Sequence, residues 1–158
     1  MRLQLIWVGK AARREPEADL CARYAKRIAA TTRFDEKVLK PIQTASLSDA
    51  EIRQRESERI AAELQPGDYL VLCDERGKQL SSPGFADFLT QRQNQAVRRV
   101  VFCIGGAMGV TDSLRQRADF VLSFSQMTLP HALARVMLLE QVYRALCIQS
   151  GHPYHHEG

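Results

Sequence analysis

The chain has 158 residues, 45% of them hydrophobic, and a formal net charge of +4 at pH 7. This length and composition predict one domain with a buried core, and the mild positive charge favours a polyanion such as nucleic acid as a partner. The four cysteines are far apart and form no C-x-x-C, which argues against disulfides and zinc. No apolar run reaches membrane length, and the apolar stretch at the N-terminus is too short and too soon followed by charged residues for a signal peptide, so we expect a cytoplasmic protein.

Five short segments predict strands, four of them apolar and one, Phe34 to Leu39, with a weak alternation that Pro41 ends. The first is the clearest, because Leu3 to Val8 is a continuous apolar run broken only by Gln4. Parallel strands covered on both faces have this composition. The predicted strands are Leu3 to Val8, Phe34 to Leu39, Tyr69 to Cys73, Arg99 to Ile104 and Phe120 to Ser123, and Asp74 to Lys78 is predicted to be a turn.

Helical patterns separate these strands. Ser48 and Glu51 form a capping-box pattern for a helix that runs to Leu64. Its only apolar stripe is Ile52, Ile60, Ala61 and Leu64, which predicts a peripheral position. Other helices are expected from Ala18 to Ala29, after Ser82-Pro83, after the capping residue Thr111 and after Pro130. The alternation predicts an α/β fold, a mostly parallel sheet with helices on both faces, in a single domain over residues 1–158.

The helix after Pro130 is apolar on nearly every face. Such a helix is either central to the core or packed against a second subunit. Glu140 and Arg144 stand four residues apart, which fits an ion pair within the helix. Arg135 has no acidic residue four positions away, so we expect it to bind a ligand or an anionic partner.

Ligands of parallel α/β sheets bind beyond the carboxyl ends of the strands. Three segments qualify here: the turn after Cys73, the glycines after Ile104 and the loop after Ser123. The pattern Gly105-Gly106-x-x-Gly109 serves either a ligand that approaches the backbone or a tight turn. A dinucleotide site is disfavoured, because the pattern falls late and Ile104 takes the place of the first glycine.

The histidines form the other group that can carry chemistry. They are His131, His152, His155 and His156, and three of them lie in the last seven residues. His131, at the start of the last helix, is either a structural or a catalytic histidine. No acid or cysteine stands near the terminal H-P-Y-H in the sequence, which argues against zinc, and no G-x-S-x-G, H-E-x-x-H or Walker motif is present.

Several motifs together resemble one family. They are an opening L-Q-L-I-x-V-G-K, the G-G-A-x-G that begins at Gly105, S-x-M-T-L-P-H, A-R-V-x-L-x-E-Q-x-Y-R-A and the terminal H-P-Y-H, and they span the chain. In this the chain resembles the large-subunit ribosomal RNA methyltransferase H family of the SPOUT class. The resemblance implies a homodimer with a C-terminal trefoil knot, which methylates N3 of a pseudouridine in 23S rRNA with S-adenosyl-L-methionine. Because so small a chain has little surface for reading RNA sequence, we expect the assembled ribosome as the substrate, and no DNA partner.

The resemblance also implies roles for individual residues. Backbone groups of three loops are expected to hold the cofactor, and the target base is expected against Tyr154 and His155, with a histidine, a tyrosine or water accepting its proton. His156 stands where the family usually has a cation, which predicts a weaker or pH-dependent grip on RNA. The expected cofactor-binding residues are Leu72, Cys73, Gly105, Gly106, Ser125, Gln126, Met127, Thr128, Leu129 and Pro130; the catalytic residues are Arg135, Tyr154 and His155; and the RNA-binding residues are Lys10, Arg13, Arg14, Arg144 and His152.

Two other functions stay open on the sequence alone. One is a non-catalytic RNA-binding module of the same fold, which would fail to bind S-adenosylmethionine. The other is an unrelated α/β enzyme with a nucleotide-type ligand. Measuring the binding of the cofactor and of its demethylated product distinguishes these two functions from a methyltransferase.

Overall fold

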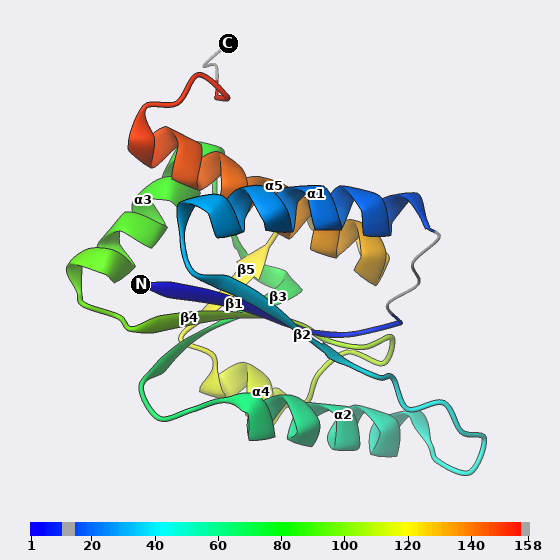
Figure 1. Cartoon of the computed structure of the whole chain (residues 1–158). Helices are drawn as coiled ribbons and strands as arrows, with labels where there is room; N and C mark the ends of the chain where they lie inside the picture. Colours follow the sequence, from blue (N-terminus) through cyan, green and yellow to red (C-terminus); the bar gives the residue numbers. More distant parts are fainter. Residues whose placement is uncertain (11–14, 156–158) are drawn as a thin grey trace.

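The computed structural model describes residues 1–10 and 15–155. A five-stranded, fully parallel sheet with the order β2-β1-β4-β3-β5 forms its centre (Figure 1). The elements in chain order are β1 (Arg2–Val8), α1 (Pro16–Thr31), β2 (Phe34–Leu39), α2 (Asp49–Glu63), β3 (Asp68–Gln79), α3 (Ser82–Asn94), β4 (Arg99–Ile104), α4 (Asp112–Arg117), β5 (Phe120–Ser123) and α5 (His131–Ser150).

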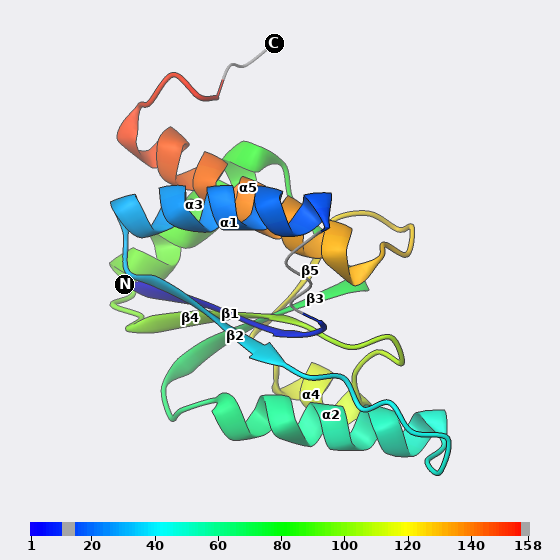
Figure 2. The same ribbon diagram turned by 45° about the vertical axis from the view of Figure 1, so that its right-hand side comes forward.

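Helices cover both faces of the sheet. Helices α1, α3 and α5 lie on one face and α2 and α4 on the other, as Figures 1 and 2 show from two directions. Alternate residues of β1 face opposite cores, because Leu5 belongs to the cluster under the first layer and Ile6 to the cluster under the second. This double burial explains why β1 and β4 are nearly continuous apolar runs, and the predicted α/β sheet with helices on both faces is confirmed.

The strand register aligns the carboxyl ends of β1, β4 and β5 with Cys73 of β3. Trp7 of β1 and Cys73 of β3 both pair with Ile104 of β4, and Cys73 also pairs with Leu122 of β5. The chain segments that follow these strands therefore leave the sheet side by side.

The predicted turn over Asp74 to Lys78 is wrong, because β3 continues to Gln79. The register shifts between Cys73 and Lys78, which both pair with Leu122, so the intervening residues leave the ladder before the strand resumes. Gly77 permits this close approach, since a Cβ there would lie 2.5 Å from the Val121 carbonyl oxygen. A tertiary pairing with β5 thus overrides the local turn signal.

The predicted helices are present with small changes at their ends. The capping box of Ser48 and Glu51 is formed, and Thr111 caps α4. Helix α3 is capped by Ser81 rather than by Ser82, which is already helical. The buried positions of α2 include Glu56 and Ser57, which the apolar stripe did not indicate.

Helix α5 lies between α1 and α3 and packs against both. Pro130 is its N-cap residue, and Gly151, at φ +68°, ends it in the left-handed conformation. Glu140 and Arg144 form the predicted ion pair, with a distance of 2.5 Å between Oε1 and Nη2. No helix in the described part of the chain combines the length and the apolar character that crossing a bilayer requires. The trefoil knot stays a prediction.

Candidate functional site

A cavity of about 320 Å³ lies at the carboxyl ends of β4 and β5, beside the part of β3 where its pairing with β5 is interrupted. The strand register brings these segments together. The lining comes from three segments that are far apart in the sequence. They are Cys73 to Arg76 within β3, Ile104 to Val110 at the end of β4 and in the loop after it, and Phe124, Ser125, Met127, Thr128, Leu129, His131 and Ala134 after β5.

The glycine loop after β4 forms the wall on the α2 side. At Gly106 a Cβ would lie 2.1 Å from Oε2 of Glu56 and 3.1 Å from Cγ1 of Val8, so no side chain fits without movement. Gly109 has φ +74° and donates its N–H to the Gly106 carbonyl at 2.9 Å. The glycines here therefore serve a tight turn and close packing of the loop against Glu56 and Val8, and the approach of a ligand to their backbone stays a prediction.

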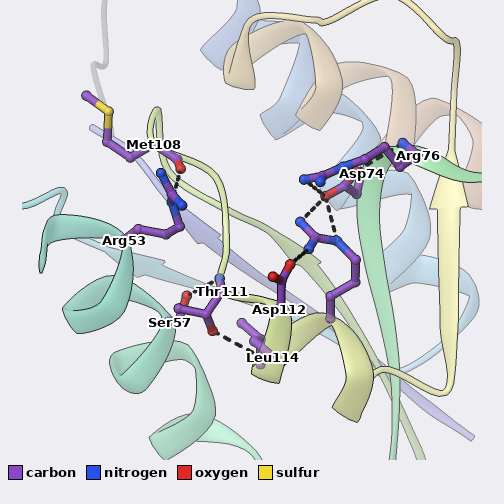
Figure 3. Close-up of polar contacts among 9 residues, drawn as sticks. Arg53, Ser57, Asp74, Arg76, Met108, Thr111, Asp112 and Leu114 are labelled. Atoms are coloured by element: carbon purple, nitrogen blue, oxygen red, sulfur yellow. Dashed lines mark hydrogen bonds and ion pairs between the residues drawn. The ribbon is translucent and has the colours of Figure 1, made fainter. Parts of the chain in front are cut away.

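Helix α2 holds this loop by side-chain hydrogen bonds (Figure 3). Arg53 Nε donates to the Met108 carbonyl at 2.8 Å, and the N–H of Thr111 donates to Ser57 Oγ at 3.0 Å. Ser57 is 4% exposed, so the second bond is protected from water. The loop is thus fixed at two points before α4 begins.

A charged cluster forms the rim beside β3. Asp74 accepts hydrogen bonds from Arg115, at 2.9 Å from Nη2, and from the N–H of Arg76 at 3.0 Å (Figure 3). Burial opposes the charge of Asp74, but these hydrogen bonds outweigh it and hold the pKa of the carboxyl below its usual range. The Arg76 side chain is 64% exposed and lines the cavity, so one cation of the cluster faces solvent at the mouth.

His131 lies in the cavity lining at the first position of α5. Burial lowers the pKa of His131 below its ordinary value, and the negative charge of Glu56 opposes that shift. A neutral imidazole at neutral pH can both donate and accept a hydrogen bond.

Most of the residues predicted to bind a cofactor meet in this cavity. Cys73, Gly105, Gly106, Ser125, Met127, Thr128 and Leu129 belong to its lining. Leu72, Gln126 and Pro130 do not, and Leu72 is fully buried inside β3. The sequence placed the segment after Cys73 at the ligand site, but it did not name Asp74 to Arg76 as cofactor-binding residues and did not assign His131 to the cavity.

The C-terminal residues form a second, separate cluster against α5 and α1. The Tyr154 hydroxyl donates to Glu140 Oε1 at 3.2 Å and lies 3.3 Å from the Tyr24 hydroxyl. Arg144 stacks over the Tyr154 ring at 4.8 Å and lies 3.3 Å from Nδ1 of His155. Burial, followed by the hydrogen bond with Tyr24, raises the pKa of Tyr154. The predicted residues Tyr154, His155 and Arg144 are therefore brought together.

This cluster lies farther along α5 than the cavity in one chain. Ala134, in the first turn, lines the cavity, whereas Tyr154 and His155 contact Glu140 and Arg144. These two residues lie six and ten positions beyond Ala134, about 9 and 15 Å along the helix axis. Figures 1 and 2 show the C-terminal segment leaving the end of α5 and turning back over the helices.

The remaining predicted residues are placed as follows. Arg135 binds Glu36 of β2, with Nη2 at 2.6 Å from Oε2, and stacks over Trp7 at 4.4 Å, outside the cavity lining. Its acidic partner is therefore on a strand and not on the same helix. Lys10 and His152 are exposed. Arg13, Arg14 and His156 lie outside the described residues. No group of three metal-ligating side chains occurs within residues 1–10 and 15–155.

Comparisons with known proteins converge on one activity class. A family model described as predicted SPOUT methyltransferase matches residues 1–155. The chain is 42% identical to ribosomal RNA large subunit methyltransferase H of Geobacter sp. (strain M21), over 99% of this chain and 100% of that protein. It is 41% identical to the protein of the same name from Gloeobacter violaceus, over 99% of each. A solved structure of a probable methylase family protein from Haemophilus influenzae Rd KW20 has the same fold, with a TM-score of 0.54 at 10% identity over 98% of this chain and 70% of that one.

Proposed function

We propose that this chain, which belongs to the SPOUT methyltransferase family, uses S-adenosylmethionine to methylate ribosomal RNA of the large subunit. In finer detail, we propose N3 of a pseudouridine in 23S rRNA as the acceptor, from the resemblance of the sequence motifs. The observation that carries the proposal is the cavity at the ends of β4 and β5 and beside β3, whose walls come from the segments that the motifs single out.

The cavity fits an adenosine-type ligand in size and in chemistry. Its volume of about 320 Å³ lies at the lower end of the range for small-molecule sites. Gly105 and Gly106 line it with backbone atoms, and Ser125 and Thr128 add hydroxyls. We propose that these loops hold the cofactor.

The cofactor, when bound, supplies the electrophilic methyl group. The chain's own task is then to align the acceptor, exclude water and accept one proton. His131 is a candidate acceptor, because burial keeps its pKa below the ordinary value and it lies in the cavity lining. Tyr154, with a raised pKa, is suited to donate a hydrogen bond rather than to act as an anion.

A second copy of the chain is proposed to complete the site. Leu133 and Met137 are exposed by 44% and 37% on adjacent turns of α5, and Met127 beside the cavity is 76% exposed. Burying these side chains against a second α5 would stabilise a homodimer. Because neither Tyr154 nor His155 lines the cavity of its own chain, we propose that they act at the cavity of the partner.

The same arrangement suggests how RNA is bound. Arg144, Lys10 and the exposed Arg76 supply cations for phosphate groups, in agreement with the net charge of +4. We propose the assembled ribosome as the substrate and the cytoplasm as the location. We also propose that Arg135 affects the site indirectly, through its contact with Trp7.

Two measurements test the proposed function. Calorimetry is expected to show binding of S-adenosylmethionine to the purified protein, and a protein that binds rRNA without the cofactor would instead be a non-catalytic RNA-binding module. Incorporation of labelled methyl groups is then compared in free 23S rRNA, isolated large subunits and whole ribosomes. Incorporation into free RNA alone would contradict the assembled substrate.

A further inference from the structure

A buried carboxylate lies behind the glycine loop. Glu56, in the interior of α2, is 3% exposed. Its Oε1 accepts a hydrogen bond from the Ile42 N–H at 2.8 Å, but its Oε2 is buried and has no hydrogen-bond partner among the described residues. The ion pairs found in this part of the chain do not include Glu56. A buried carboxylate in this state is unfavourable unless something compensates for it.

The uncompensated oxygen faces the wall of the cavity. A Cβ on Gly106 would lie 2.1 Å from Oε2 and 3.0 Å from Cδ of Glu56, so the carboxylate fills the space that a side chain at Gly106 would need. Gly106 lines the cavity on its other side. The charge of Glu56 also acts on His131, a second lining residue. Glu56 therefore places a negative charge directly behind Gly106, on the side of this residue that faces away from the cavity.

We propose that Glu56 makes the cavity prefer the cationic methyl donor over the neutral product of methyl transfer. This inference rests on the proposed function. S-adenosylmethionine carries a sulfonium cation, and S-adenosylhomocysteine has a neutral sulfur but the same other charged groups. A negative charge with no counterion in the protein attracts the first ligand and not the second, and its low exposure limits screening. Glu56 does not line the cavity, so it determines specificity through its field without touching the ligand.

The ratio of the two affinities isolates this effect. Glu56→Gln keeps the side-chain shape and the acceptor for Ile42 but removes the charge. We expect the preference for S-adenosylmethionine over S-adenosylhomocysteine, measured by calorimetry, to fall roughly tenfold. A tenfold change is about 1.4 kcal/mol, which equals the interaction of two unit charges about 12 Å apart at an effective dielectric constant of about 20. Glu58→Gln is the matched control, because it makes the same change of charge on an exposed position of α2 and should leave the ratio unchanged.

Two further variants complete the test. Glu56→Asp retains the charge and should keep the ratio within about threefold of the wild type. Glu56→Ala removes the charge without burying an amide, and it replaces Glu56→Gln if circular dichroism shows that variant to be unfolded. An unchanged ratio in a folded, uncharged variant would overturn the inference while leaving the proposed function intact. A wild-type protein that binds neither ligand would overturn both.

Discussion

Substituting alanine at Gly106 tests the packing of the glycine loop against α2. The new Cβ would lie 2.1 Å from Glu56 Oε2 and 3.1 Å from Val8 Cγ1. Glu56 cannot simply swing away, because its other oxygen binds the Ile42 N–H and the residue is 3% exposed. Forcing one methyl group into a packed site lowers the free energy of unfolding by about 1–3 kcal/mol. Replacing glycine with alanine also reduces the conformational entropy of the unfolded chain, which offsets about 0.4–1 kcal/mol of this loss. We therefore expect a net loss of about 1–2 kcal/mol and weaker binding of S-adenosylmethionine.

Urea unfolding followed by circular dichroism measures this loss. Gly84→Ala is the matched control, since Gly84 lies in α3 and its nearest neighbour would be Ser81 Oγ at 3.1 Å. In a Glu56→Ala background the same change at Gly106 meets no carboxylate, so the double variant should be more stable than the sum of the single effects predicts, by about 1 kcal/mol. Additive effects, or a Gly106→Ala protein as stable as the wild type, would refute the reasoning.

Three more predictions follow from other contacts. Met137→Glu places a charge on the exposed apolar face of α5, and light scattering should show dissociation to monomers that still bind S-adenosylmethionine but no longer methylate. Burial opposes the charge of Asp68, but its hydrogen bond to Arg99 lowers the pKa of Asp68. The charged Asp68 therefore stabilises the folded state fully above about pH 4, and this contribution is lost on further acidification. Asp68→Asn should remove about 3 kcal/mol at neutral pH and flatten the acid limb of a pH series of urea unfolding. Tyr24→Phe removes one of the groups that raise the pKa of Tyr154, so NMR titration of labelled tyrosine should show that pKa falling.

The strands were predictable because local composition determines them. Arg99–Ile104 and Phe120–Ser123 occur with the predicted bounds, since a strand covered on both faces must be apolar along its length. Phe34–Leu39 also has the predicted bounds, although it is an edge strand with no buried residue. The extension of β3 was not predictable in this way. Its final residues pair with Leu122 and Ser123, more than forty positions away, and nothing local encodes that pairing.

Long-range partners also account for the charged residues that the sequence left unassigned. Arg135 seemed free because no acid lies one turn away on its helix, yet Glu36 binds it across 99 positions. Glu56 seemed to belong to the solvated face of a peripheral helix, and only the folded chain shows that it is buried behind Gly106. Spacing rules detect partners on the same helix, as with Glu140 and Arg144, but not partners supplied by the sheet topology.

The separation of the two predicted sets of site residues bears on how the enzyme would lose activity. The motifs identified the cofactor loops and the terminal Tyr154 and His155 together, yet neither of these two residues lines the cavity of its own chain. If the partner supplies the tail, the cavity of an isolated chain retains all of its own walls, from Cys73 through Gly106 to Ala134. Loss of the dimer should then abolish methyl transfer and leave the affinity for S-adenosylmethionine nearly unchanged. Damage to the glycine loop should instead weaken the affinity for S-adenosylmethionine while the dimer stays intact, which makes the two kinds of variant distinguishable in a single binding experiment.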